Sequence, residues 1–271
     1  MKTRVLSAAV LAPLLLIVVL FLPKVFTGVI AALSCSMMAY ELLYSTGLVR
    51  HTRLVLYSAV MAFFVGIWCY TGMNYGWGML VFLAFFAALF SELMMNHVKI
   101  RFDRITVCFL AAVLIPFLFS ALIRIHIQKY GRYLIMIPFF VAWLSDSGAY
   151  FAGRAFGQRK LAPVISPKKT VEGMIGGILV AMAGLVAYML VLNIFFDFKV
   201  NYVYALIYGL VGSLGGVFGD LCFSAVKRQA GIKDYSNLIP GHGGMLDRVD
   251  SMIVVAPLVE ALFILIPVAV K

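Results

Sequence analysis

Charged side chains are scarce in this chain. Only 12% of its 271 residues are Asp, Glu, Lys or Arg, just 11 are acidic, and 64% are hydrophobic. Soluble domains carry about 25% charged residues, so this composition excludes an ordinary soluble protein. The apolar runs have the length of about 20 residues that a membrane-crossing helix needs, and they lack the alternation of a β-barrel strand. The sequence therefore predicts an all-α, polytopic integral membrane protein.

Cysteine is also rare in this chain, and the common nucleotide-binding motifs are absent. The four cysteines lie singly in or beside separate apolar runs, without the close pairing of a zinc site or a disulfide framework. There is no G-x-x-x-x-G-K-[ST] loop and no dinucleotide fingerprint, so the familiar soluble nucleotide folds are not indicated. No repeat or linker divides the chain. We expect a single membrane domain, 1–271, with scaffold helices mainly in 1–130 and the chemistry in 131–271.

The apolar runs predict about nine transmembrane helices. The first, which follows Lys2 and Arg4, has no clear cleavage site, and we interpret it as a retained span rather than a signal peptide. The predicted spans are 5–22, 26–45, 54–71, 76–95, 106–123, 133–152, 174–195, 202–225 and 251–270.

The net charge of +11 does not point to nucleic acid, because the basic residues form short clusters between apolar runs. Such clusters mark topology and contact anionic lipid. A cytoplasmic N-terminus places sixteen of the 22 Lys and Arg residues inside, as the positive-inside rule favours. We therefore expect a protein of the cytoplasmic membrane whose polar loops, 153–173 and 226–250, both face the cytoplasm.

Two acidic residues, Glu41 and Glu92, fall within apolar runs. An ionisable group in a membrane span is costly and is by default a functional candidate. Each also lies near the end of its span, where it can reach the interface or pair locally. Both interpretations stay open.

The segment 143–160 carries the first polar constellation. If the sixth span stays helical, Asp146, Tyr150 and Arg154 follow at i, i+4 and i+8 and project from one face. Asp146 is then an acidic group directed at an active site. The alternative is an arrangement of Asp146 and Arg154 that closes a helix end.

The segment 165–177 predicts an anion site. Ser166 before Pro167 has the form of an N-cap with a first-turn proline, so a helix is expected to begin there. A helix start beside Lys168 and Lys169 suits a polyphosphate. The alternative is that the lysines mark the cytoplasmic side and that Lys168 pairs with Glu172.

The segment 219–251 holds four of the eleven acidic residues. Helical spacing places Asp220, Ser224 and Lys227 on one face, and the preceding glycines, 212–219, indicate close helix packing. Asp247 and Asp250 stand before the ninth span. Mg²⁺ prefers one or two protein carboxylates together with substrate phosphates, and Asp220 and Asp247 meet that need.

A glycine-rich turn lies between these carboxylates. Gly243 and Gly244 allow backbone N–H groups to approach an anion, and His242 can donate to a phosphate or a leaving group. A lone histidine is often merely a hydrogen-bonded loop residue. Its place between two carboxylates favours contact with substrate.

The run SAVKRQAGIKDYSNLIPGHGGMLDRVD resembles the signature of the phosphatidate cytidylyltransferase family, the CDP-diacylglycerol synthases. SDSGAY and SPKKTVEG are similar to further family motifs, whereas the first 130 or so residues match only in hydrophobic character. The resemblance implies that CTP and phosphatidic acid react to give CDP-diacylglycerol and pyrophosphate, and that this reaction requires Mg²⁺. It also implies that Asp220 and Asp247 belong to the metal centre, and it leaves a second cation open.

These considerations assign predicted roles to individual residues. The predicted catalytic residues are Asp220, Asp247, Lys227 and His242. The predicted ligands of the CTP or lipid phosphates are Asp146, Ser166, Lys168, Lys169, Ser224, Arg228, Lys233, Gly243, Gly244, Arg248 and Asp250.

Two other functions stay in view. A CTP-dependent lipid kinase of related architecture would transfer the terminal phosphate instead. A transporter is suggested by Glu41, Glu92, Asp146 and Glu260 near apolar spans, but the charge gathers in two loops rather than at the midplane of inverted repeats. The oligomeric state, a homodimer included, stays open.

Overall fold

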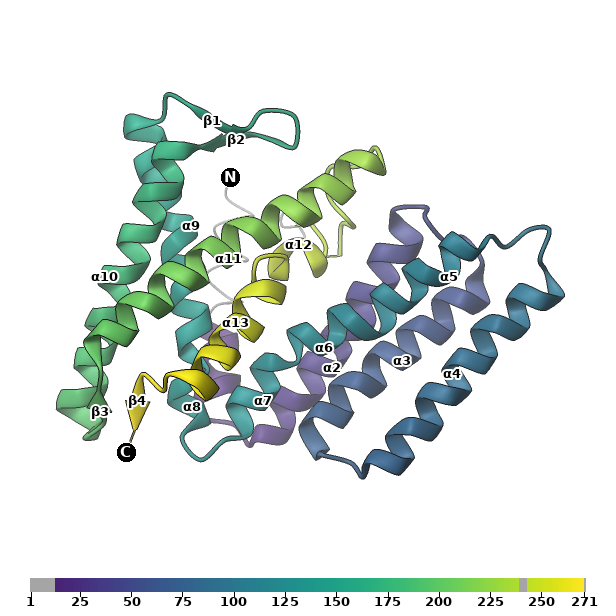
Figure 1. Cartoon of the computed structure of the whole chain (residues 1–271), viewed down its shortest axis with the longest axis horizontal. Coiled ribbons are helices and arrows are strands. Elements are labelled where there is room, and N and C mark those ends of the chain that lie inside the picture. Colours follow the sequence, from purple (N-terminus) through teal and green to yellow (C-terminus); the bar gives the residue numbers. More distant parts are fainter. Residues whose placement is uncertain (1–12, 239–242, 271) are drawn as a thin grey trace. The chain divides into compact units, whose positions relative to one another are not determined.

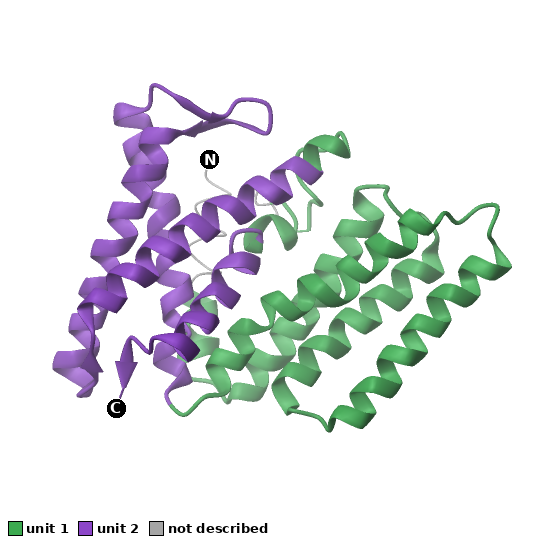
Figure 2. Cartoon of the chain, viewed as in Figure 1, with its two compact units in different colours: residues 1–129, 227–249 green, residues 130–226, 250–271 purple. Residues whose placement is uncertain are grey.

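The structure is a computed structural model that describes residues 13–238 and 243–270. Helices dominate it, and the chain forms two compact units (Figure 2). Unit 1 comprises 1–129 and 227–249, and unit 2 comprises 130–226 and 250–271. Each unit is thus built from two separate stretches of sequence. Residues 227–249 fold with the N-terminal helices.

Unit 1 is a group of long helices (Figure 1). Its helices are α2 Lys24–Tyr40, the π-helix η1 Glu41–Ser45, α3 Thr52–Thr71, α4 Tyr75–Met95, α5 Phe102–Phe109, the π-helix η2 Leu110–Leu114, α6 Ile115–Phe119, α7 Ala121–Ile127 and α12 Leu246–Val249. Residues 13–20 are also helical. Helices α2 and α3 pack closely at Gly66, where an added Cβ would lie 2.7 Å from the Ala32 Cα. Small residues at this contact let the backbones approach, as in other membrane helix pairs.

Unit 2 is organised around a closely packed helix pair. Its elements are α8 Gly131–Leu134, α9 Met136–Phe156, β1 Lys160–Ala162, β2 Ser166–Thr170, α10 Val171–Phe196, β3 Lys199–Val200, α11 Tyr202–Gln229, α13 Met252–Leu265 and β4 Ala269–Val270. The last turn of α11 belongs to unit 1. Helices α9 and α10 lie side by side (Figure 1). At Gly177 an added Cβ would lie 2.5 Å from the Ser145 carbonyl oxygen, so glycine is required there.

The predicted all-α membrane fold is confirmed. Within the described residues, seven helical stretches are long and apolar enough to cross a bilayer: 24–45, 52–71, 75–95, 102–127, 131–156, 171–196 and 202–229. The chain is an integral membrane protein. Residues 5–12 of the predicted first span lie outside the described residues. The predicted ninth span is the 14-residue helix α13, shorter than the ~20 residues of a crossing, and it gives way to β4.

The predicted helix start at Ser166 is wrong. Ser166 opens strand β2, which pairs antiparallel with β1, and α10 begins five residues later at Val171. The N-cap is Thr170, whose hydroxyl accepts a hydrogen bond from the Gly173 amide at 3.1 Å. A proline is tolerated in an edge strand, so Pro167 fits the hairpin as well as it fits a first helical turn. Glu172, in that first turn, accepts hydrogen bonds from the backbone amides of Gln158 and Arg159.

This correction leads to a stability prediction. Thr170→Val keeps the shape of the side chain but removes the capping acceptor, and it is expected to cost about 1 kcal/mol of stability. Ser166→Ala is the matched control, because Ser166 caps no helix, and it is expected to change stability by less than half of that amount. Thermal unfolding in detergent measures both. Equal effects would contradict the cap assignment.

Candidate functional site

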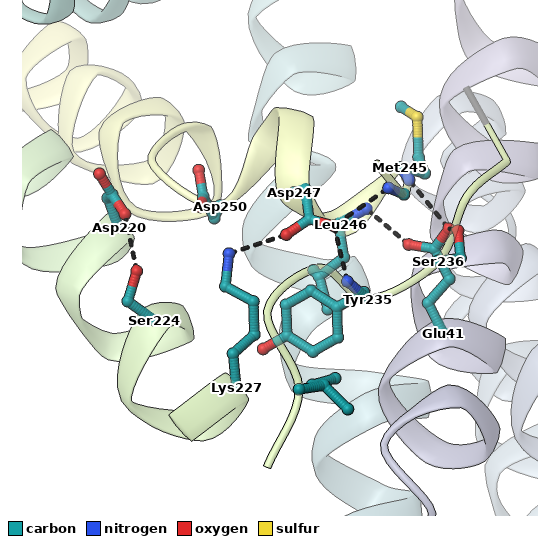
Figure 3. Close-up of polar contacts among 12 residues, drawn as sticks. Glu41, Asp220, Ser224, Lys227, Tyr235, Ser236, Met245, Leu246, Asp247 and Asp250 are labelled. Atoms are coloured by element: carbon teal, nitrogen blue, oxygen red, sulfur yellow. Dashed lines mark hydrogen bonds and ion pairs between the residues drawn. The ribbon is translucent and has the colours of Figure 1, made fainter. Parts of the chain in front are cut away.

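A buried carboxylate, Asp247, organises residues 227–249 of unit 1, which are called the polar segment below. The Asp247 Oδ1 accepts a hydrogen bond from the Lys227 Nζ at 2.7 Å, and its Oδ2 accepts from the backbone amides of Tyr235 at 2.7 Å and Gly244 at 3.0 Å (Figure 3). Only 2% of the Asp247 side chain is exposed, and only 10% of that of Lys227. A buried charge is tolerated when it is paired and hydrogen-bonded in this way. Asp247 therefore connects α11, the following loop and α12.

The two described glycines of the predicted phosphate turn have a structural explanation. Gly243 has a φ of +81°, which disfavours other residues, and an added Cβ would lie 2.9 Å from the Asp247 Oδ2. At Gly244 an added Cβ would lie 2.6 Å from each carboxylate oxygen of Glu41. Each glycine thus makes room for a carboxylate of the protein itself. His242 lies outside the described residues.

A second buried carboxylate, Glu41, holds the same segment. Glu41 opens the π-helix η1 and is 2% exposed. It accepts hydrogen bonds from the Ser236 Oγ at 2.6 Å and from the amides of Met245 at 2.9 Å and Leu246 at 2.8 Å. Sequence reasoning flagged Glu41 as an ionisable group in an apolar run, but its partners are 195 or more residues away and could not be read from the pattern.

Glu92, by contrast, fits the helix-end interpretation. It accepts hydrogen bonds from Arg53 at 3.2 Å and from Asn96, four residues on, at 3.2 Å. His51 lies 4.0 Å away. These contacts join the C-terminal end of α4 to the start of α3 and do not involve the polar segment.

Unit 2 contains a second acidic centre, at Asp220 on α11. One oxygen of Asp220 accepts a hydrogen bond from the Ser224 hydroxyl at 3.0 Å, and the other contacts the Lys169 ammonium on β2. The two side chains of this ion pair are about a quarter exposed, 28% for Asp220 and 25% for Lys169. The Asp220 carboxylate is therefore much more accessible than that of Asp247.

The start of α13 packs directly beside this part of α11. An added Cβ at Gly219 would lie 2.8 Å from the Asp250 carbonyl oxygen. Gly216 likewise faces Val255, so the small residues predicted to permit close packing do so. The Asp250 carboxylate accepts a hydrogen bond from the Ser251 amide at 2.8 Å. Asp220 and the backbone of Asp250 are thereby held at one end of unit 2.

A pocket of about 340 Å³ brings the two polar motifs of unit 2 together. Helix α9 stays helical throughout, and Asp146, Tyr150 and Arg154 all face this pocket. The β1–β2 hairpin contributes Lys168 and Lys169 to the same lining. The structure thus unites Asp146 with both lysines, and Lys169 links the pocket to Asp220.

The remaining predicted ligands lie on the surface of the polar segment or the hairpin. Arg228 is exposed and its Nη1 donates to the Ile232 carbonyl at 3.3 Å. Lys233 and Arg248 are also exposed, and Ser166 is partly exposed. Among the residues that the structure describes, no group of three or more His, Cys, Asp or Glu side chains is arranged to hold a metal ion.

Nearly the whole chain matches one known protein family. The model of the Cytidylyltransferase family matches residues 2–266. The chain belongs to this family. The resemblance inferred from the signature is thereby confirmed, and the family match extends over the N-terminal helices, which residue motifs alone did not reach.

Several relatives match about half of the sequence. A phosphatidate cytidylyltransferase of Bacillus subtilis (strain 168) is 43% identical over 157 residues, 58% of this chain and 57% of the relative. One of Haemophilus influenzae is 41% identical over 155 residues, 55% of this chain and 54% of the relative. One of Staphylococcus saprophyticus is 46% identical over 134 residues, 49% and 50% of the two chains. The chain spans about half the length of the curated relatives it matches.

Proposed function

We propose that this protein transfers the cytidylyl group of CTP to phosphatidic acid, giving CDP-diacylglycerol and pyrophosphate. The observation that carries the proposal is the pocket of unit 2, which is lined by Lys168, Lys169 and Asp146 and which Lys169 links to the partly exposed carboxylate of Asp220. Family membership and the printed names of the relatives support the same reaction. The proposal makes the protein a nucleotidyltransferase of phospholipid biosynthesis.

The chemistry requires binding and charge neutralisation more than proton transfer. A phosphate oxygen of phosphatidic acid, already ionised near neutral pH, attacks the α-phosphorus of CTP, and the bond to the β-phosphate oxygen breaks to release pyrophosphate. Lys168 and Lys169 bind the phosphates and keep them aligned. Exposed Arg228, Lys233 and Arg248 are proposed to attract the anionic substrates. No covalent enzyme intermediate is proposed.

The acidic residues fit a hard divalent cation, and we propose Mg²⁺. Its chemistry, when it is bound, is to neutralise charge on the transferring and leaving phosphates. Asp220 offers partly exposed carboxylate oxygens, and Ser224 adds a hydroxyl. Among the residues that the structure describes, the Asp247 Oδ1 has one hydrogen-bond partner, Lys227, and a carboxylate oxygen has capacity for a second. The assignment of Asp220 and Asp247 to the metal stays a prediction, as does a second cation.

We assign Lys227 a supporting role in place of the directly catalytic role predicted from the sequence. Its ammonium is buried against Asp247 and lies 5.4 Å from the centroid of the Tyr235 ring. We propose that Lys227 supports catalysis by fixing Asp247. The roles of His242 and of the Gly243 and Gly244 amides toward phosphate stay predictions.

The membrane setting suits the two proposed substrates. We propose that the N-terminus and the substrate pocket face the cytoplasm, because the Lys and Arg residues gather in loops on one predicted side. CTP then arrives from the cytosol, whereas phosphatidic acid arrives from the bilayer. A homodimer stays a prediction.

Product analysis tests the reaction directly. We expect that detergent-purified protein supplied with α-labelled CTP, phosphatidic acid and Mg²⁺ places the label in a CDP-lipid. With γ-labelled CTP the label should appear in pyrophosphate. A lipid kinase would instead move the γ-label to a lipid, and flux without CTP turnover in proteoliposomes would indicate a transporter. Omission of phosphatidic acid, or its replacement by diacylglycerol, is the matched control and should abolish product.

A further inference from the structure

Glu41 contacts the polar segment of unit 1 on both sides of residues 239–242. Ser236 precedes those residues, whereas Met245 and Leu246 follow them, and all three donate to the Glu41 carboxylate at 2.6–2.9 Å (Figure 3). One side chain from the first half of the sequence therefore binds two separate stretches of the segment. Because the acceptor is a carboxylate, each of these hydrogen bonds is charge-assisted and therefore stronger than a bond between neutral groups.

Asp247 binds the same two stretches through different donors. Its Oδ2 accepts from Tyr235, next to Ser236, and from Gly244, next to Met245. Neighbouring donors are thus shared between two carboxylates. The amides of Tyr235 and Gly244 donate to Asp247, and the Ser236 hydroxyl and the amides of Met245 and Leu246 donate to Glu41. Because Leu246 directly precedes Asp247 in the sequence, a shift of the Leu246 amide moves the Asp247 backbone as well.

A buried carboxylate at a helix end does not need partners that are far away in the sequence, but Glu41 has them. Glu92 shows the simpler solution, since it is satisfied by Asn96 in its own helix end and by Arg53. Glu41 instead uses partners 195, 204 and 205 residues away. A Cβ added at Gly244 would lie 2.6 Å from both Glu41 oxygens, so the glycine leaves room for this carboxylate.

We propose that Glu41 is a positioning residue for the reaction, acting through the backbone of 235–246 to hold Asp247 and Lys227 in place. The inference rests on the proposed function, because it assigns Glu41 a part in that reaction. A misplacement of about 1 Å in a reacting group can cost on the order of 10²-fold in rate. We expect Glu41→Ala to reduce kcat by about that factor while the KM for CTP changes much less.

The first experiment compares Glu41→Ala and Glu41→Gln with Glu92→Gln as the matched control. Gln keeps the shape of Glu41 but replaces one acceptor oxygen by a donor, so we expect most of the kcat loss to remain. Glu92→Gln removes a similarly buried charge away from the segment and should keep kcat near the wild-type value. If wild-type protein makes no CDP-lipid, the proposed function fails; if it does and Glu41→Ala retains full kcat, only the positioning role fails.

Hydrogen exchange provides a readout that does not depend on activity. The amides of Met245 and Leu246 should exchange at least tenfold faster in Glu41→Ala, whereas amides of α3 and α4 should not change. If Glu41→Ala does not fold, Ser236→Ala removes one of the three donors and should still accelerate exchange at Met245. Unchanged exchange in the folded variant would overturn the proposal.

A double-mutant cycle tests the contact at Gly244. Gly244→Ala places a methyl group 2.6 Å from both Glu41 oxygens and is expected to reduce kcat strongly in the wild-type background. In the Glu41→Ala background the same substitution meets no carboxylate and should cost several-fold less. Contacting residues show such non-additivity, whereas independent ones do not. Additive effects would contradict the assigned contact.

Discussion

Asp247→Asn is expected to abolish CTP turnover and to destabilise unit 1. The substitution leaves the Lys227 ammonium buried without its counter-charge, and breaking a buried pair by removing one partner costs roughly 3–5 kcal/mol. If the asparagine oxygen keeps the amides of Tyr235 and Gly244, its NH2 group takes the place of Oδ1 and opposes the Lys227 ammonium, donor against donor. Thermal unfolding in detergent and steady-state turnover measure the two effects separately.

The double variant Asp247→Asn/Lys227→Met separates structural from metal-binding contributions. It removes both charges, so stability should recover by most of the loss seen in the single variant. Turnover should not recover, because the predicted metal ligand is still missing. Recovery of turnover together with stability would show that Asp247 acts only by holding the segment, and normal Mg²⁺-dependent turnover in Asp247→Asn itself would refute its catalytic assignment.

Asp220→Asn should lose activity with little loss of stability. The ion pair of Asp220 with Lys169 is about a quarter exposed, and exposed pairs contribute at most about 1 kcal/mol to stability. Loss of a group that neutralises charge in the transition state costs on the order of 10²–10³-fold in kcat. We also expect the variant to need more Mg²⁺ for half-maximal turnover.

Ser224→Ala is the matched comparison for Asp220→Asn. It removes one hydrogen bond to the Asp220 carboxylate but leaves the charge, so its cost should stay near 1 kcal/mol, or about fivefold in rate. Its Mg²⁺ requirement should rise much less than that of Asp220→Asn, because a hydroxyl contributes no charge to a cation site. An equal effect of the two substitutions, or an unchanged Mg²⁺ requirement in Asp220→Asn, would remove Asp220 from the predicted metal site.

The membrane helices could be predicted because their signal is local. A run of about 20 apolar residues has few alternatives in a bilayer, where every backbone group must be hydrogen-bonded within the protein. The same reasoning located the face of α9 that carries Asp146, Tyr150 and Arg154. It failed at 251–270, because apolar character alone did not reveal that the helix ends at Leu265.

What the sequence did not reveal at the site are contacts that a local residue pattern does not encode. Ser166 and Pro167 have the local form of a helix start, but pairing with Lys160–Ala162 makes them a strand, and Thr170 becomes the cap. Gly244 suggested an approach to phosphate, which stays a prediction, and the structure adds a second reason for glycine, since an added Cβ would lie 2.6 Å from the oxygens of Glu41. No spacing rule connects residues 41 and 244, so the contact appears only in the folded protein.

Because Glu41 and its hydrogen-bond donors are far apart in the sequence, the ribosome makes Glu41 well before it makes the donors. Ser236 is made 195 residues after Glu41, a delay of roughly 10–40 s at 5–20 residues per second. During that interval the helices that carry Glu41 enter the membrane without the donors that later satisfy its charge. The N-terminal helices must therefore accommodate a carboxylate through water, lipid headgroups or the insertion machinery until the ribosome has delivered the segment that encloses it.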